Sequence, residues 1–268
     1  MRKYLLKRVA TSLLTILGIV VVVFFIVRVL PGDAAAVRAG PYANQELIDR
    51  IADKYGLNDP LHVQFVDYVS GFAQGDLGIS IRTNQSVTRE LLDRLPASLE
   101  LAVYSVILAT AVGVSLGVLS AHRQNTWIDR LSRIFAVVGS AMALFWLGLL
   151  LTFFFAFTWR WFPGPVDRLA VGSEDPGTYT GFYTIDGILS GRPDITVEAF
   201  RYLALPVITL AFVLAAPILK MVRSAMIEAL DSDFVRTAKA VGVPRTQILF
   251  VDGFRNALIP VTTTIGIV

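Results

Sequence analysis

Cysteine is absent from the 268 residues, and histidine occurs only twice. Without cysteine the chain can form no disulfide, thiolate metal ligand or cysteine nucleophile. The two histidines, His62 and His122, lie far apart and show neither HxxxH nor HExxH spacing. We therefore expect no metal site, and the histidines are interpreted as surface residues.

Charged residues are also scarce: they make up 17% of the chain, whereas 54% of the residues are hydrophobic. A soluble domain carries about 25% charged and about 45–50% apolar residues. The net charge of +3 is dispersed and forms no basic face of the kind that binds nucleic acid. The phosphate-binding pattern GxxxxGK[ST] is missing, and the apolar stretches hold no acid–base or metal constellation. These absences argue against nucleic-acid binding, an ATPase site and an intramembrane enzyme. The composition indicates an integral protein of the lipid bilayer.

Apolar segments long enough to cross a bilayer occur at four places, since about 20 residues span the hydrocarbon. They are Val9–Leu30, Ser98–Ala121, Ile134–Thr158 and Tyr202–Leu219. A fifth begins near Ala257 and reaches the last residue. The first segment exceeds the 7–15 apolar residues of a signal peptide, so we interpret it as a retained helix. We expect four complete membrane helices and the start of a fifth.

The distribution of Lys and Arg predicts the orientation, because basic residues gather in cytoplasmic loops. Four basic residues precede the first segment, and the short turn 122–133 and the connection 220–256 also carry more basic than acidic residues. The connections 31–97 and 159–201 carry more acidic ones. This pattern places the amino terminus in the cytoplasm and residues 31–97 and 159–201 outside.

The two external segments differ in character. Residues 31–97 are too long for a turn and read as a small external subdomain. Helical spacing of apolar residues predicts helices over Gln45–Tyr55 and Leu61–Phe72, separated at Gly56 and Asp59-Pro60. The second segment, Pro163–Phe200, is rich in glycine and proline and predicts an ordered loop.

The cytoplasmic connection contains a short amphipathic helix. Asp231 or Ser232 can cap it, and Gly242 stands where a left-handed C-terminal cap belongs. An apolar stripe is formed by Phe234, Val235, Ala238 and Val241. Such a stripe can lie on lipid, dock into a groove on a soluble partner, or pack within the chain.

A resemblance to a known family rests on this connection and on further motifs. Phe234–Gly242, followed by Arg255-Asn256-Ala257-Leu258-Ile259-Pro260, resembles the EAA loop of ABC importer permeases of the dipeptide, oligopeptide and nickel family. Further matches are Leu30-Pro31-Gly32-Asp33, Gly56-Leu57-Asn58-Asp59-Pro60, Gly75-Asp76-Leu77-Gly78-Ile79-Ser80 and Ser98-Leu99-Glu100-Leu101. Arg236-Thr237-Ala238 replaces the Glu-Ala-Ala that names the loop.

The resemblance implies an all-α, polytopic membrane bundle of the type I ABC importer fold. It divides the chain into 1–30 (amino terminus and first membrane helix), 31–97 (external subdomain) and 98–268 (permease core). Such permeases have six membrane helices, so we expect the sequence to be a subunit cut within the fifth. The implied location is the prokaryotic plasma (inner) membrane.

The resemblance also implies a role as the transmembrane permease of an ATP-driven importer for dipeptides or oligopeptides. Its partners would be a second homologous permease, two nucleotide-binding ATPase subunits that carry the ATP and magnesium, and an extracytoplasmic solute-binding protein; this chain would hold no cofactor and catalyse no reaction. The implied contact with the ATPase is made by Asp233, Phe234, Val235, Arg236, Thr237, Ala238, Lys239 and Gly242.

Several alternatives stay open. The cargo can instead be a nickel chelate, glutathione or another small solute, and a membrane sensor or scaffold is the competing class. Pro206 and Pro217 should bend the fourth helix as a hinge, or shape it for packing. Glu100, an acid within a membrane segment, is read as an anion stabilised by the first turn of its helix. Arg28 is expected to reach the outer interface.

Overall fold

Helices make up most of the part of the chain that the computed structural model describes, which is residues 2–29, 34–40, 42–80, 83–165, 167–177, 179–244, 247–248 and 253–267. Its helices are α1 (Arg2–Val29), α2 (Ala34–Ala39), α3 (Gln45–Lys54), α4 (Leu61–Ala73), α5 (Val87–His122), α6 (Trp127–Ala141), α7 (Leu144–Leu151), the π-helix η1 (Thr152–Thr158), α8 (Tyr183–Leu189), α9 (Pro193–Leu230), α10 (Asp233–Ala240) and α12 (Phe254–Ile267). Within these residues β-pairing is limited to one isolated bridge, Ile79 with Ser86. The predicted all-α class is confirmed.

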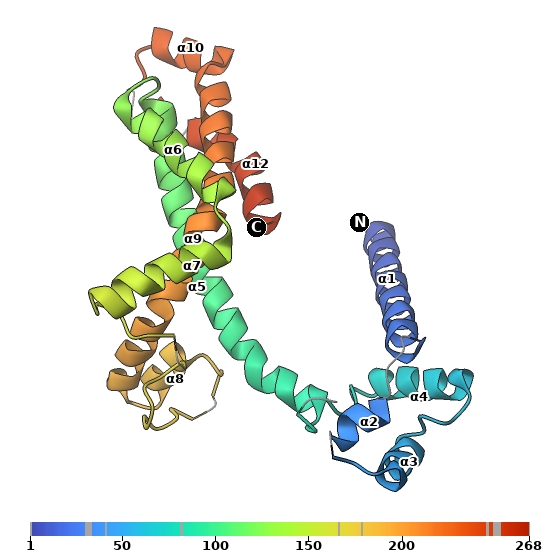
Figure 1. The fold of residues 1–268 in the computed structure, drawn as a ribbon. Coiled ribbons are helices and arrows are strands. Elements are labelled where there is room, and N and C mark those ends of the chain that lie inside the picture. The colour runs from blue at the N-terminus through green and yellow to red at the C-terminus, as the bar shows by residue number, and fades with distance from the viewer. Residues whose placement is uncertain are drawn as a thin grey trace. The chain divides into compact units, whose positions relative to one another are not determined.

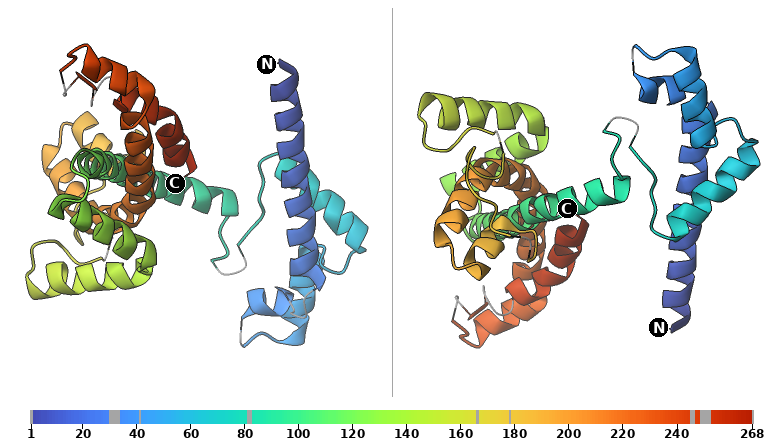
Figure 2. Two further views of the ribbon diagram at one scale, coloured as in Figure 1. Left: turned by 90° about the horizontal axis from the view of Figure 1, so that it is seen from above. Right: turned by 90° about the horizontal axis from the view of Figure 1, so that it is seen from below.

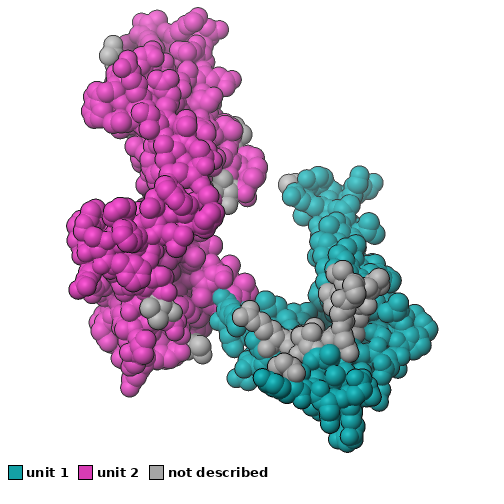
Figure 3. All heavy atoms as spheres, in the orientation of Figure 1, with its two compact units in different colours: residues 1–94 teal, residues 95–268 magenta. Residues whose placement is uncertain are grey.

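The structure divides into two compact units, Met1–Arg94 and Leu95–Val268 (Figure 3). The first unit contains the two helices predicted after the first membrane segment. In α3 the Asn44 side chain accepts a hydrogen bond from the Leu47 amide at 3.0 Å, as an N-cap should. In α1, the Phe24 ring meets Phe65 of α4 edge-on, with centroids 5.2 Å apart. This contact packs α4 against α1.

The second unit is organised along α9, against which α6, α7, α8 and α12 pack (Figures 1 and 2). Small residues let α5 approach α9 closely: they recur every fourth position, at Ala109, Gly113, Gly117 and Ala121. A Cβ atom added at Gly117 would lie 2.6 Å from the Val222 Cβ atom, and one at Gly113 would lie 2.9 Å from that of Ile218. Such spacing of small residues is how membrane helices bring their backbones together.

Candidate membrane spans are provided by three single helices, which are α1, α5 and α9. The segment predicted as one straight helix, Ile134–Thr158, is instead a bent pair. The α6 helix ends at Ala141, and the following helix Leu144–Thr158 leaves it at an angle of 109°. Met142 and Ala143 cause the break because their backbones are extended, with ψ angles of 134° and 128°.

The bent pair nevertheless passes from one end of the unit to the other. Before it, Asp129 bonds to Ser120 and to Arg223. After it, Arg168 bonds to Glu100. Glu100 and Ser120 lie about 30 Å apart along α5, which is the thickness of the hydrocarbon layer. The chain between Asp129 and Arg168 therefore connects the two ends, and the bent pair within it is a candidate fourth span.

Two membrane helices extend further than their apolar runs predict. The helix expected from Ser98 starts at Val87, and the one expected over Tyr202–Leu219 runs from Pro193 to Leu230. Polar residues continue both helices beyond the hydrocarbon, where water can solvate them. The predicted loop Pro163–Phe200 accordingly includes α8 and the start of α9. The Leu30–Asp33 motif and the Arg28 side chain lie outside the described residues.

Candidate functional site

The short amphipathic helix predicted in the cytoplasmic connection is α10, which follows α9 directly (Figure 1). Ser232 takes the N-cap position with extended backbone angles, although its hydroxyl donates to the Ala229 carbonyl instead of an amide of α10. Gly242 has a φ of 82°, the left-handed conformation predicted for the C-terminal cap. The Gly242 amide donates to the Lys239 carbonyl, and the Val243 amide donates to that of Ala238. These two bonds end α10 sharply.

The apolar stripe of α10 is divided between the inside and the outside of the chain. Val235 is fully buried, whereas Phe234 is 45% exposed and Val241 75% exposed. Ala238 is half-buried. Val235 therefore anchors α10 to its own chain, and the two outward side chains are available to another surface. Packing within the chain accounts for Val235 alone.

The polar side chains predicted in α10 lie on its exposed surface. Asp233 occupies the first turn, and Arg236 approaches it with a nitrogen–oxygen distance of 3.4 Å. Thr237 donates its hydroxyl to the Asp233 carbonyl at 3.0 Å, and Lys239 is exposed. The structure thus brings all eight predicted residues onto one short, capped element, with seven of them wholly or partly accessible.

A buried ion pair lies at the same end of the unit as α10. Asp129 is fully buried and accepts hydrogen bonds from Arg223 Nε at 2.7 Å and Arg223 Nη2 at 3.1 Å. The Ser120 hydroxyl and the Asn125 amide also donate to it, at 2.6 and 3.1 Å. This cluster joins the ends of α5, α6 and α9. The sequence interpretation missed it, although Asp129 is the one acid in a turn with three arginines.

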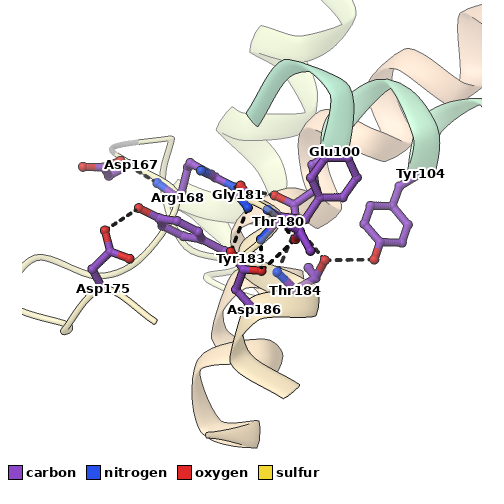
Figure 4. A network of polar contacts seen from close by, with 11 residues as sticks. Glu100, Tyr104, Asp167, Arg168, Asp175, Thr180, Gly181, Tyr183, Thr184 and Asp186 are labelled. Carbon is purple, nitrogen blue, oxygen red and sulfur yellow. Dashed lines mark hydrogen bonds and ion pairs between the residues drawn. The ribbon is translucent and has the colours of Figure 1, made fainter. Parts of the chain in front are cut away.

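A second buried carboxylate, Glu100, organises the opposite end of the unit (Figure 4). It is fully buried, and its oxygens accept bonds from Arg168 Nη2 at 2.7 Å and from the Thr184 amide and hydroxyl at 2.9 and 2.5 Å. The prediction that the first turn of its helix stabilises Glu100 is wrong, because α5 begins at Val87. Its charge is instead balanced by Arg168, from the loop before α8.

The loop around this carboxylate is held by further polar contacts (Figure 4). Asp186 accepts bonds from the Thr180 amide and hydroxyl and from the Gly181 amide, at 2.7–2.9 Å. The Arg168 guanidinium lies 3.6 Å from the centre of the Tyr183 ring. Burial and the hydrogen bond that it donates to Asp175 raise the pKa of the Tyr183 hydroxyl, which therefore stays protonated. These contacts give the predicted ordered loop its structure.

The remaining predicted residues, Pro206 and Pro217, lie inside α9 on its exposed side. The helix is continuous through both, and the hinge stays a prediction. Among the described residues, no group of three His, Asp or Glu side chains is placed to hold a metal ion.

Comparison with known proteins identifies the family. The model of the binding-protein-dependent transport system inner membrane component matches residues 113–268. The corresponding N-terminal model matches residues 1–102. The chain belongs to this family of inner-membrane transport components. The resemblance drawn from the motifs along the chain is thereby confirmed, and the chain is a permease subunit of a transport system, embedded in the membrane by its apolar helices.

Curated relatives match almost the whole length of this chain. The probable D,D-dipeptide transport system permease protein DdpB of Escherichia coli is 41% identical over 95% of this chain and 74% of its own length. The dipeptide transport system permease protein DppB of Alkalihalophilus pseudofirmus is 36% identical over 100% of this chain and 80% of its own. The glutathione transport system permease protein GsiC of Salmonella typhimurium is 33% identical over 100% and 78%.

Proposed function

We propose that this permease forms half of the translocation path of an ATP-driven importer for dipeptides or oligopeptides, and that α10 couples it to an ATPase subunit. The observation that carries the coupling role is the half-exposed Phe234 on a short helix whose neighbour Val235 is fully buried. An apolar side chain presented to water by a firmly anchored helix fits a groove on a soluble partner. The names of the relatives DdpB and DppB support the peptide cargo.

Force applied to α10 would reach the membrane helices through a short connection. Only Asp231 and Ser232 separate α10 from α9. The Arg223–Asp129 ion pair ties the end of α9 to the first turn of α6. Closure of nucleotide-binding subunits, which would hold the ATP and magnesium, would push Phe234 and move these three helices together. A rearrangement of α5, α6 and α9 would then open the path to one side of the membrane.

The same proposal assigns the two ends of the second unit to the two sides of the inner membrane. Residues 122–133, which join α5 to α6 and include the start of α6, carry three arginines against one acid, which supports a cytoplasmic location for them and for α10. The four basic residues near the start of α1 support the same location for the amino terminus. The loop ordered around Glu100 would then face outward. Together with α3 and α4, it would meet an extracytoplasmic solute-binding protein that delivers the cargo. A second homologous permease would complete the path.

Two alternatives differ in what they require. A glutathione or nickel-chelate importer would use the same α10 contact with another cargo, and the name of the relative GsiC favours glutathione among these. A membrane sensor or scaffold would use α10 to recruit a signalling partner without ATP.

Gentle detergent purification of the full protein, with mass spectrometry of what stays bound, separates the classes. An ATPase and a second permease are expected; their absence in lipid nanodiscs would favour the sensor.

The coupling role is tested with Phe234→Ala in the complete transporter, reconstituted in proteoliposomes. We expect peptide uptake per ATP hydrolysed to fall at least about tenfold, because losing one buried aromatic contact removes more than 1.4 kcal/mol of binding. The matched control is Phe153→Ala, on the π-helix, where the phenylalanine is 57% exposed. If both variants transport as the unmodified protein does, α10 is not the coupling element.

Gly242→Val provides a second, independent test of α10. Its φ of 82° is strained for a β-branched residue, so the helix end should shift while membrane insertion is kept. We expect uncoupled ATP hydrolysis in this variant also. Gly172→Val is its control, because Gly172 has a similarly positive φ of 95° but lies in the loop before α8, away from α10.

A further inference from the structure

One side of the second half of α9 carries polar residues although the helix is a candidate membrane span. The exposed residues there are Pro217, Lys220, Met221, Ser224 and Glu228, and the three polar ones, Lys220, Ser224 and Glu228, repeat every four positions. Residues with that spacing share one face of a helix. The exposed side chains of α7 are apolar instead, as at Leu144, Phe145, Trp146 and Leu149. A surface like that of α7 suits lipid, whereas the face of α9 does not.

Lys220 directs its charge toward the middle of the membrane. Its Nζ atom donates a hydrogen bond of 2.8 Å to the Ser140 hydroxyl in the last turn of α6. Ser140 lies about 16 Å along α6 from Asp129 at the inner end. The adjoining Gly139 lies against Ala216 and Phe212, both further into the membrane than Lys220. The ammonium therefore does not extend outward to the cytoplasmic interface, as a lysine near a helix end usually does.

The ammonium also lies beside the break between α6 and α7. The last carbonyl oxygens of a helix accept no hydrogen bond from amides of the same helix, and their partial negative charge attracts a cation. Ser140, Ala141 and Ala143 are exposed at this break. Within the described part of the chain, no carboxylate comes within ion-pair distance of Lys220. Irregular backbone and unpaired charge at membrane depth are tolerated where they face protein or water, not lipid.

We infer that Lys220, the α6–α7 break and the polar face of α9 line a water-filled part of the solute pathway, where the Lys220 ammonium meets a carboxylate of the cargo. The inference rests on the proposed import of peptides, because every peptide with a free C-terminus carries such a carboxylate. Water in the pathway solvates both the ammonium and the open end of α6, which explains how the membrane tolerates them. Pairing with the carboxylate draws the cargo past the break.

The first test uses the absence of cysteine from the chain. Lys220→Cys is compared with Leu149→Cys, whose leucine is 65% exposed on the apolar face of α7, and with Gln124→Cys in the turn between α5 and α6. A charged methanethiosulfonate reagent is applied to inside-out vesicles that contain the complete transporter without cysteine in its partners. The reagent needs a thiolate, and thiolates form in water and not in lipid.

Residue 220 should react within about tenfold of the rate at residue 124, and at least about tenfold faster than residue 149. A rate at residue 220 as slow as that at residue 149 would overturn the inference, since this face of α9 would then be covered by lipid or by another subunit. This measurement needs no cargo, so it stands even if the peptide proposal fails.

The second test addresses the carboxylate. Uptake of dialanine and of its C-terminal amide is measured in proteoliposomes with the unmodified transporter, Lys220→Arg and Lys220→Gln. We expect Lys220→Gln to reduce uptake of dialanine about tenfold, with little effect on the amide, and Lys220→Arg to keep most of it. Equal losses for both compounds would show a structural role and contradict the inference. If the unmodified transporter imports neither compound while glutathione is imported, the peptide proposal fails instead.

Discussion

Replacing Asp129 by asparagine should destabilise the second unit, because the change removes the charge and keeps the shape. The carboxylate is fully buried and receives two bonds from Arg223, one from the Ser120 hydroxyl and one from the Asn125 amide. An asparagine amide can accept with one oxygen only, so its NH₂ group would face a donor. The Arg223 guanidinium would lose its counter-charge.

The size of the effect follows from the burial of the two partners. Removing one member of a buried ion pair costs about 3–5 kcal/mol. The Arg223 side chain keeps 25% of its surface exposed, so water can stabilise the freed charge in part. We therefore expect a loss of about 2–3 kcal/mol, which shifts the unfolding equilibrium about 30- to 150-fold.

The assay is reversible unfolding of the purified protein in mixed micelles, titrated with a denaturing detergent. Arg130→Gln is the matched control, because its side chain is exposed one position along α6 and should change stability by less than about 0.5 kcal/mol. The double variant Asp129→Asn/Arg223→Gln should lose less than the sum of the two single changes. An Asp129→Asn protein as stable as the control would refute the ion pair as a fastening between α6 and α9.

Further predictions concern packing, the outer network and topology. Gly117→Val should lower stability by about 1–3 kcal/mol, because its side chain would overlap Val222, whereas Gly18→Val, with no neighbour within 4 Å, should be tolerated in the same assay. Glu100→Gln should cost about 1–3 kcal/mol and make the loop before α8 cleavable by protease at lower concentration. A cysteine at Val171 should react with an impermeant thiol reagent applied to intact cells, and one at Gln124 only after permeabilisation; the reverse would overturn the orientation.

Topology labelling is better placed at Val171 and Gln124 than at two exposed asparagines of the predicted external and cytoplasmic connections. Asn84 and Asn125 are exposed but have φ angles of 58° and 61°, a conformation that asparagine tolerates better than cysteine. Val171 is 91% exposed, and Gln124 lies in the exposed turn between α5 and α6. Substitution there changes the label site without straining the backbone.

The features predicted correctly from sequence are those with a strong local cause. The length of an apolar run dictates a membrane helix, and Gly242 followed by Pro244 dictates the end of α10. The amphipathic spacing in α3 and α4 likewise needs no knowledge of neighbours. The motifs along the chain, taken together, identified the family.

The features that sequence did not reveal depend on distant partners. Glu100 and Arg168 are joined only by folding, and so are Asp129 and Arg223. The break lies at Met142 and Ala143, neither of which is a helix breaker, and the Gly139-Ser140 pair shortly before it was not used in the sequence interpretation. The small residues from Ala109 to Ala121 did carry a readable signal for close packing, which periodicity of apolar residues alone overlooks.

The most direct test of the central claim is ATP-driven uptake of radiolabelled dialanine into proteoliposomes that contain this permease, its partner subunits and their solute-binding protein. The account predicts uptake that requires ATP and the binding protein, and that falls at least about tenfold per ATP hydrolysed when Phe234 is replaced by alanine. Uptake that needs no ATP, or a Phe234→Ala transporter that couples as well as the unmodified one, would contradict it.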